Sequence, residues 1–184
     1  MKSRIASLGL AVLAAGALAA CSKSDKPGDG DGDGQAPKAV VEPDAAQVKR
    51  EIGEMVKAVF NADMGPIEKH SHEKAIAVVG DRQTFIETME RYFREAKDAG
   101  VRLVSFESGE PEFFSGEVHH FALVPTTVVM FAAGEESTNP GHQLGVKKKT
   151  DEIWKYIDCS SLTTEMAREW FPDFPPDRNL PSPE

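Results

Sequence analysis

The sequence predicts an α+β fold in which N-terminal helices pack across a strongly curved antiparallel sheet of about four strands, followed by a short C-terminal helix. Apolar residues recur every three or four positions between residues 44 and 100, which is the period of amphipathic helices. From Val101 the period changes to two, and a long β-branched run covers 118–132. Helices that precede a set of strands are typical of α+β domains.

Three helices are expected before the sheet. Asp44 can cap the first, with Gln47 as its capping-box partner. Asp63 can cap a second helix that runs through Val78. The third carries an apolar face and ends at Gly100, which suits a helix C-cap.

The second half of the sequence predicts strands at 101–107 and 118–132, separated by a loop at 109–117. Pro125 interrupts the second strand, and because proline has no N–H we expect a bulge or a bend there. Segments 142–149 and 152–158 should pair as a hairpin, and 162–170 should form the last helix.

The chain begins with the features of an export signal in residues 1–20. Lys2 and Arg4 precede an apolar stretch of alanine and leucine that is too short for a stable membrane span. The stretch ends in Leu-Ala-Ala-Cys, which resembles a lipoprotein cleavage box, so Cys21 is the predicted site of lipid attachment. Several acyl chains would anchor the protein permanently in the membrane. Ser22 in place of aspartate favours the outer membrane, facing the periplasm, if the organism sorts lipoproteins by the proteobacterial rule.

Residues 21–43 predict a flexible tether rich in glycine, aspartate and proline, without aromatic side chains. Asp29, Asp31 and Asp33 resemble the start of a calcium loop. The twelfth position, however, is Val40 where such a loop needs a bidentate carboxylate. The domain is therefore expected at 44–170, with a proline-rich tail at 171–184. Trp170, Phe171 and Phe174 are too apolar for a free tail and should fold back onto the domain.

Composition narrows the range of partners. The net charge of −9 becomes −11 once the signal's two positive charges are removed, which argues against nucleic acid as a partner. After lipidation of Cys21 only Cys159 remains, so no intramolecular disulfide can form. The basic run 147–149 is interpreted as an exposed hairpin tip.

The histidines are not spaced as metal ligands, and no phosphate loop or nucleophile motif occurs, so neither a metal nor another cofactor is expected. Asp63 is sufficiently explained as a helix cap. No pair of polar residues has a spacing diagnostic of catalysis, which leaves catalysis open but favours a non-enzyme. The side chains that could line a pocket are His70, Tyr92, His120, Trp154 and Tyr156.

Three motifs carry a family resemblance over about residues 46 to 160. They are Val-Gly-Asp-Arg at 79–82, Val-Pro-Thr-Thr at 124–127, and a hairpin from Gly145-Val146 to Trp-Lys-Tyr-Ile-Asp at 154–158. The chain resembles bacterial envelope lipoproteins of unassigned activity with a cone-shaped, nuclear transport factor 2-like (cystatin-like) domain. It departs from them at 147–153, which replaces an Asp-Gly-Gly turn. The resemblance implies a fold and a location, but no activity.

Two hypotheses follow for the function. The first is a non-catalytic binding module that holds a protein partner or a small apolar molecule in its concave face. The second is a small pocket enzyme of the isomerase, dehydratase or hydrolase kind that uses a histidine or aspartate base. A carboxylate or histidine facing a tyrosine in an enclosed pocket would favour the enzyme. In either case we expect the third helix to lie across the sheet, with Phe85, Met89 and Phe93 facing Val124 and Val128, and Trp154 closing one end.

Overall fold

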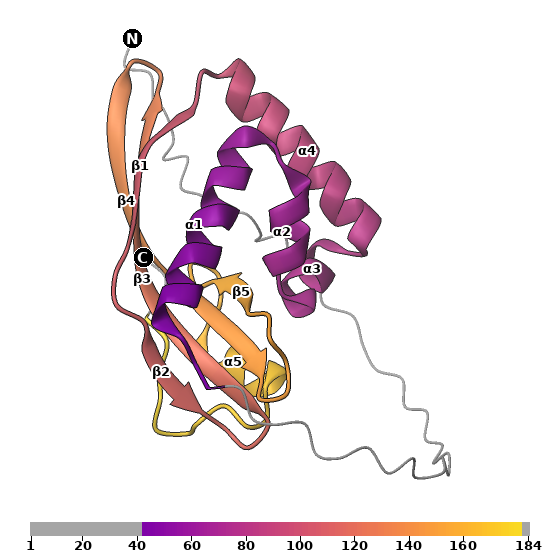
Figure 1. The fold of residues 1–184 in the computed structure, drawn as a ribbon. Helices are drawn as coiled ribbons and strands as arrows, with labels where there is room; N and C mark the ends of the chain where they lie inside the picture. Colours follow the sequence, from indigo (N-terminus) through magenta and orange to yellow (C-terminus); the bar gives the residue numbers. More distant parts are fainter. Residues whose placement is uncertain (1–41, 182–184) are drawn as a thin grey trace.

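The computed structural model describes residues 42–181 and has the predicted α+β architecture (Figure 1). The expected signal peptide, Cys21 and the tether up to residue 41 lie outside the described residues. In chain order the elements are α1 (Ala45–Asn61), α2 (Met64–His70), α3 (Glu73–Val79), α4 (Arg82–Asp98), β1 (Arg102–Ser108), β2 (Glu112–Ser115), β3 (His119–Ala132), β4 (Glu135–Lys148), β5 (Lys155–Asp158) and α5 (Thr164–Trp170). Within the described part of the chain, no helix is long and apolar enough to cross a membrane.

The sheet is antiparallel and open, with strand order β1-β3-β4-β5. β1 and β2 both pair with the same edge of β3, one after the other, so five strands make a sheet four strands wide. β3 and β4 are 14 residues each and form one long hairpin. Its turn is Ala133-Gly134, and the φ angles of 53° and 91° are those that a two-residue hairpin turn requires.

One sequence expectation for this sheet is wrong. The expected loop 109–117 contains strand β2, whose Phe113 and Phe114 are half-buried. Of the bulge or bend expected at Pro125, no bulge occurs toward β4, because the β3–β4 register continues through the pair Pro125↔His142. The Pro125 carbonyl accepts from Gly109 on the opposite side, where β1 ends and β2 has not begun. In an antiparallel strand the N–H and C=O of one residue point to the same neighbour. The N–H that Pro125 lacks would therefore point between β1 and β2, where no strand accepts it, so no hydrogen bond of the sheet is lost.

The helix caps are largely as predicted, but the second helix is divided. Asp44 and Asp63 accept hydrogen bonds from the first turns of α1 and α2. The predicted helix from Asp63 to Val78 breaks at Ser71, which is extended and bridges Tyr156 of β5. The backbone N–H of His72 donates to the Tyr156 carbonyl at 3.2 Å, so pairing with the sheet interrupts the helix.

Helix α1, and not α4, packs against the sheet. Val48 and Ile52 of α1 form a buried cluster with Val124 of β3 and with Trp154. Phe85, Met89 and Phe93 of α4 instead pack with Ala58 and Ile67 of α1 and α2, which corrects the expectation that they face Val124 and Val128. Helix α4 is therefore an outer layer (Figure 1).

The other face of the sheet is covered by α5 and the C-terminal segment. Phe121 belongs to a cluster with Phe171, Phe174 and Leu180, whereas its neighbour Ala122 packs under α1. Successive strand residues point to opposite faces, so these two clusters lie on opposite sides of the sheet. The prediction that the aromatic residues after α5 fold back is confirmed, and the packing extends to Leu180.

Candidate functional site

Two of the predicted pocket residues meet in a buried polar network between α1 and β5. The Tyr156 hydroxyl donates to Glu51 Oε2 at 3.1 Å, and His70 Nδ1 lies 3.7 Å from the same carboxylate. His70 Nδ1 also lies 3.2 Å from the Trp154 carbonyl oxygen. The network thus combines a carboxylate, a histidine and a tyrosine. These are the groups that would favour an enzyme if a substrate could reach them.

The network is closed to solvent. Glu51, His70 and Tyr156 are 6%, 0% and 2% exposed. Burial, reinforced by the Glu51 charge, raises the pKa of Tyr156, so its hydroxyl remains protonated and committed to Glu51. The Nε2 atom of His70 and the Nε1 atom of Trp154 are buried without a hydrogen-bond partner. We conclude that this network is part of the core of the domain.

Trp154 contacts this network through its carbonyl, and the other two predicted pocket residues, Tyr92 and His120, lie apart from it. Tyr92 is half-buried on α4, where its ring packs edge-on against Phe93 and burial raises its pKa. His120 is buried on β3, with Nδ1 2.7 Å from the hydroxyl of Ser115. Burial and the nearby Lys147 lower its pKa. Neither residue lines either of the two hollows described below.

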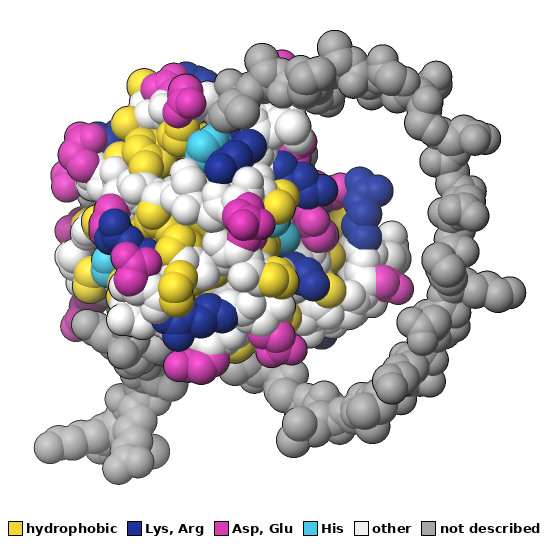
Figure 2. Space-filling model, turned by 90° about the horizontal axis from the view of Figure 1, so that it is seen from below, with side chains coloured by type: hydrophobic (Ala, Val, Ile, Leu, Met, Phe, Trp, Pro, Cys, Tyr) yellow, Lys and Arg dark blue, Asp and Glu magenta, His cyan; other side chains and the backbone are white. Residues whose placement is uncertain are grey.

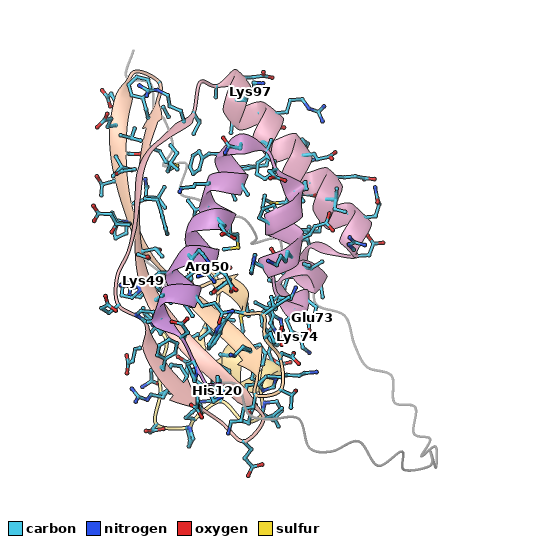
Figure 3. The ribbon with its side chains drawn as sticks, in the orientation of Figure 1. Lys49, Arg50, Glu73, Lys74, Lys97 and His120 are labelled. Carbon is cyan, nitrogen blue, oxygen red and sulfur yellow. The ribbon has the colours of Figure 1, made fainter. Side chains whose placement is uncertain are left out.

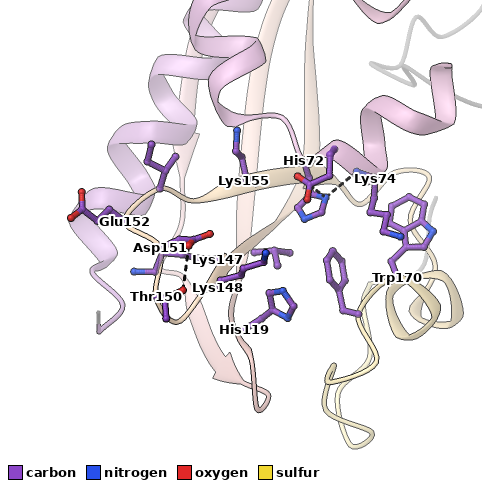
Figure 4. Close-up of a pocket in the computed structure, with 14 residues that line it drawn as sticks. His72, Lys74, His119, Lys147, Lys148, Thr150, Asp151, Glu152, Lys155 and Trp170 are labelled. Carbon is purple, nitrogen blue, oxygen red and sulfur yellow. Dashed lines mark hydrogen bonds and ion pairs between the residues drawn. The ribbon is translucent and has the colours of Figure 1, made fainter. Parts of the chain in front are cut away.

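One hollow in the described part of the chain is a cleft of about 820 Å³ next to the start of β5, which we call the lysine–histidine cleft (Figure 4). Its walls come from the start of α3, from the β4–β5 hairpin and from the end of α5. Seen from that end of the molecule, basic, acidic and apolar side chains are interspersed (Figure 2). The lining residues are His72, Glu73, Lys74, His119, Val146, Lys147, Lys148, Thr150, Asp151, Glu152, Ile153, Lys155, Trp170 and Phe171.

His72 is fixed by two contacts at the edge of this cleft. Its Nδ1 accepts the backbone N–H of Lys74 at 3.1 Å and so caps α3. Its ring packs edge-on against Phe171, with centroids 5.1 Å apart. Burial lowers the pKa of His72 to about 4, although Glu73 nearby opposes the shift. His72 is therefore neutral at neutral pH, with its single ring proton on Nε2.

His119 lies on the wall formed by β3, where Asp173 orients its ring. Nδ1 of His119 donates to Asp173 Oδ1 at 2.8 Å, while Oδ2 accepts the backbone N–H groups of Val118 and His119. Burial alone would raise the pKa of Asp173, but the hydrogen bonds from His119 and Val118 lower it. No local pattern links these residues, which are 54 positions apart, so the sequence did not reveal the pair.

The basic run 147–149 is not simply an exposed tip. Lys147 is only 2% exposed, and its ammonium lies 5.1 Å from the centre of a Trp154 ring. Burial lowers its pKa, while Glu51 opposes that shift. Lys148 is exposed and Lys149 half-buried. The predicted hairpin forms in part: the pairing runs only from Gln143↔Asp158 to Val146↔Lys155, and residues 149–154 form a wide loop over the cleft.

A second, smaller hollow lies between the helical layer and β5. This apolar groove has a volume of about 170 Å³, below the usual range for a whole small-molecule ligand. Tyr156 is the one predicted pocket residue among its lining. The other lining residues include Met55, Val56, Met89, Leu162, Met166 and Trp170.

Metal and thiol chemistry find little support between residues 42 and 181. No group of three or more histidine, cysteine, aspartate or glutamate side chains there could hold a metal ion. Cys159 is 4% exposed, and burial together with Asp158 raises the pKa of its thiol to about 12. Such a thiol is a poor nucleophile at neutral pH, and its side chain packs in the core.

The chain matches no protein-family model, and a search of curated proteins finds no sequence relative.

Proposed function

We propose that this protein is a lipid-anchored envelope protein whose domain is a non-catalytic binding module of the cone-shaped, nuclear transport factor 2-like kind. The long β3–β4 hairpin and the placement of α1 across one sheet face support that fold assignment. We place the ligand in the lysine–histidine cleft. Its volume of about 820 Å³ lies within the range that encloses small molecules.

One observation favours binding over catalysis. The carboxylate, histidine and tyrosine that could form an acid–base site are packed together, 0 to 6% exposed. Neither Glu51 nor His70 lines the cleft or the apolar groove. A ligand in the cleft would instead meet lysines, imidazoles, aromatic rings and three carboxylates.

The anchoring part of the proposal predicts a change in location. Cys21→Ala removes the thiol to which lipid would be attached, so the protein should leave the membrane fraction or keep its signal uncleaved. Cell fractionation and the intact mass of the purified protein test this prediction. Membrane association with the wild-type mature mass in the variant would contradict it.

The location of the ligand site can be tested with two matched tryptophan variants. Ile153 and Val104 are 43% and 42% exposed, but only Ile153 lines the cleft. Ligand-observed NMR with a library of small charged and neutral compounds should give hits that Ile153→Trp weakens because the ring fills the cleft. Val104→Trp on β1 should keep them. Hits that survive Ile153→Trp unchanged would show that the cleft is not the site.

The His119–Asp173 pair supports one alternative, an enzyme that uses His119 as a base. A carboxylate that holds Nδ1–H leaves Nε2 as the proton acceptor. In that case some compounds from the same library would be converted to products, and His119→Gln would abolish conversion while binding persisted. Binding without conversion in the wild-type protein favours the binding module.

A further inference from the structure

We propose that the ligand of the lysine–histidine cleft is an organic anion, a carboxylate or phosphate group attached to a flat apolar body. The inference rests on the proposed function, because it specifies what the same cleft holds. Three features of the cleft support it: the charges, the imidazole of His72 and the apolar walls.

The cleft carries an excess of cations on an acidic protein. Four lysines line it against three carboxylates, whereas the whole chain has 30 acidic residues to 21 lysines and arginines. Lys74 and Lys148 are exposed and available to a ligand. A local positive potential within an acidic surface concentrates anions at that place.

Glu73 shows how a carboxylate responds to this environment. Burial alone would raise its pKa, but the hydrogen bond at the start of α3, the adjacent His72 and the charges of Lys155 and Lys148 lower it. The anionic form is thus favoured at the cleft wall. A ligand carboxylate or phosphate would lie in the same field, within reach of the lysine ammonium groups.

His72 adds a directional donor. Since its Nδ1 already accepts from Lys74, the ring proton is on Nε2 and can donate to a ligand oxygen. Cations alone would attract any anion. A neutral N–H donor held by Phe171 and by the cap of α3 adds a requirement for an acceptor oxygen at one position.

The apolar walls specify the rest of the ligand. Val146, Ile153, Trp170 and Phe171 all line the cleft, and Ile153 is one of four large apolar residues that are exposed between residues 42 and 181. An inorganic anion would leave these surfaces in contact with water. An aromatic or alicyclic body would cover them and gain about 25 cal/mol per Å² of apolar area removed from water.

The test compares charged and neutral probes of the same shape. The full chain in detergent is titrated with benzoate, phenylphosphate and benzamide by NMR, with empty micelles as the blank. Benzoate and phenylphosphate should bind about tenfold more tightly than benzamide, and added salt should reduce that difference. The two anions show whether the cleft prefers carboxylate or phosphate.

Lysine variants locate the effect. In the Lys74→Gln/Lys148→Gln double variant the benzoate affinity should fall about five- to tenfold, because two exposed charges are lost. Lys57→Gln/Lys97→Gln is the matched control with two exposed lysines elsewhere. Lys97 lies at the far end of α4 from Lys74 (Figure 3), and the control should bind benzoate like the wild type.

Three results would overturn the inference, and they separate its failure from that of the proposed function. If benzamide binds as tightly as benzoate and Ile153→Trp blocks both, the cleft is a ligand site but not an anion site. If benzoate binds equally well to the Lys74/Lys148 and the Lys57/Lys97 variants, the anion lies elsewhere. If no probe or library compound is sensitive to Ile153→Trp, both proposals fail.

Discussion

Truncation of Phe121 to alanine should destabilise the domain by about 3 to 5 kcal/mol. Its side chain is fully buried in the cluster between the sheet and α5. The ring stacks on Phe114 at 5.4 Å and meets Phe171 and Phe174 edge-on at 5.8 and 5.2 Å. One substitution removes contacts to β2 and to the C-terminal segment at once. This loss is a large part of the free energy of unfolding of an ordinary domain, which is roughly 5 to 15 kcal/mol. Denaturant unfolding measures it.

Phe131→Ala is the matched control, because Phe131 lies on the same strand and, ten positions on, on the same face. Phe131 is only half-buried, and Arg102 lies over its ring at 4.3 Å. Its truncation should cost about 1 to 2 kcal/mol, since less area is lost from the core. Equal losses in the two variants would mean that the C-terminal segment does not complete the core as described.

The second large effect is a pH dependence caused by His72. The pKa of His72 is about 4 in the folded protein and near 6.5 when unfolded, so between these pH values the unfolded chain binds more protons. The free energy of unfolding should therefore fall as the pH is lowered from about 6.5 to 4. At about 1.4 kcal/mol for each pKa unit, the full contribution is about 3 kcal/mol.

His72→Asn isolates this contribution. Asparagine keeps an oxygen that can cap α3, but it does not titrate. Other groups near the site, among them Glu73, Lys155 and His119, are present in both proteins, so the difference between the two stability curves reports His72. We expect that difference to change across pH 4 to 6.5 and to be flat above pH 7. Parallel curves across the whole range would show that His72 is not buried in its neutral form.

The features that sequence alone determined are those set by neighbours along the chain. The apolar stripe that includes Val48 and Ile52 predicted α1. Asp44 and Asp63 indicated where helices begin, because a capping side chain accepts hydrogen bonds from the first turn of its own helix. The change to a period of two at Val101 marked the sheet for the same local reason. The hairpin partners around Gly145 and Tyr156 were also within reach of sequence reasoning.

The tertiary structure decided the features that depend on contacts far apart in the chain. Residues 135–141 contain no large aliphatic or aromatic side chain and show no alternation, yet they form a strand because β3 provides a paired edge. The register of β3 and the return of the C-terminal segment bring Asp173 onto His119. Three helices have similar apolar stripes, so periodicity cannot tell which of them meets the sheet.

The accessibility of the candidate site residues also depends on contacts between distant parts of the chain. Of the five predicted pocket residues, His70 and Tyr156 do meet, but as part of the buried network with Glu51, which the sequence did not single out. Lys147 reads locally as one of three exposed lysines, whereas the packing of Trp154 buries it. The type of a residue determines which chemistry its side chain can carry out. Whether solvent and ligand can reach the group depends on side chains brought to it by the fold.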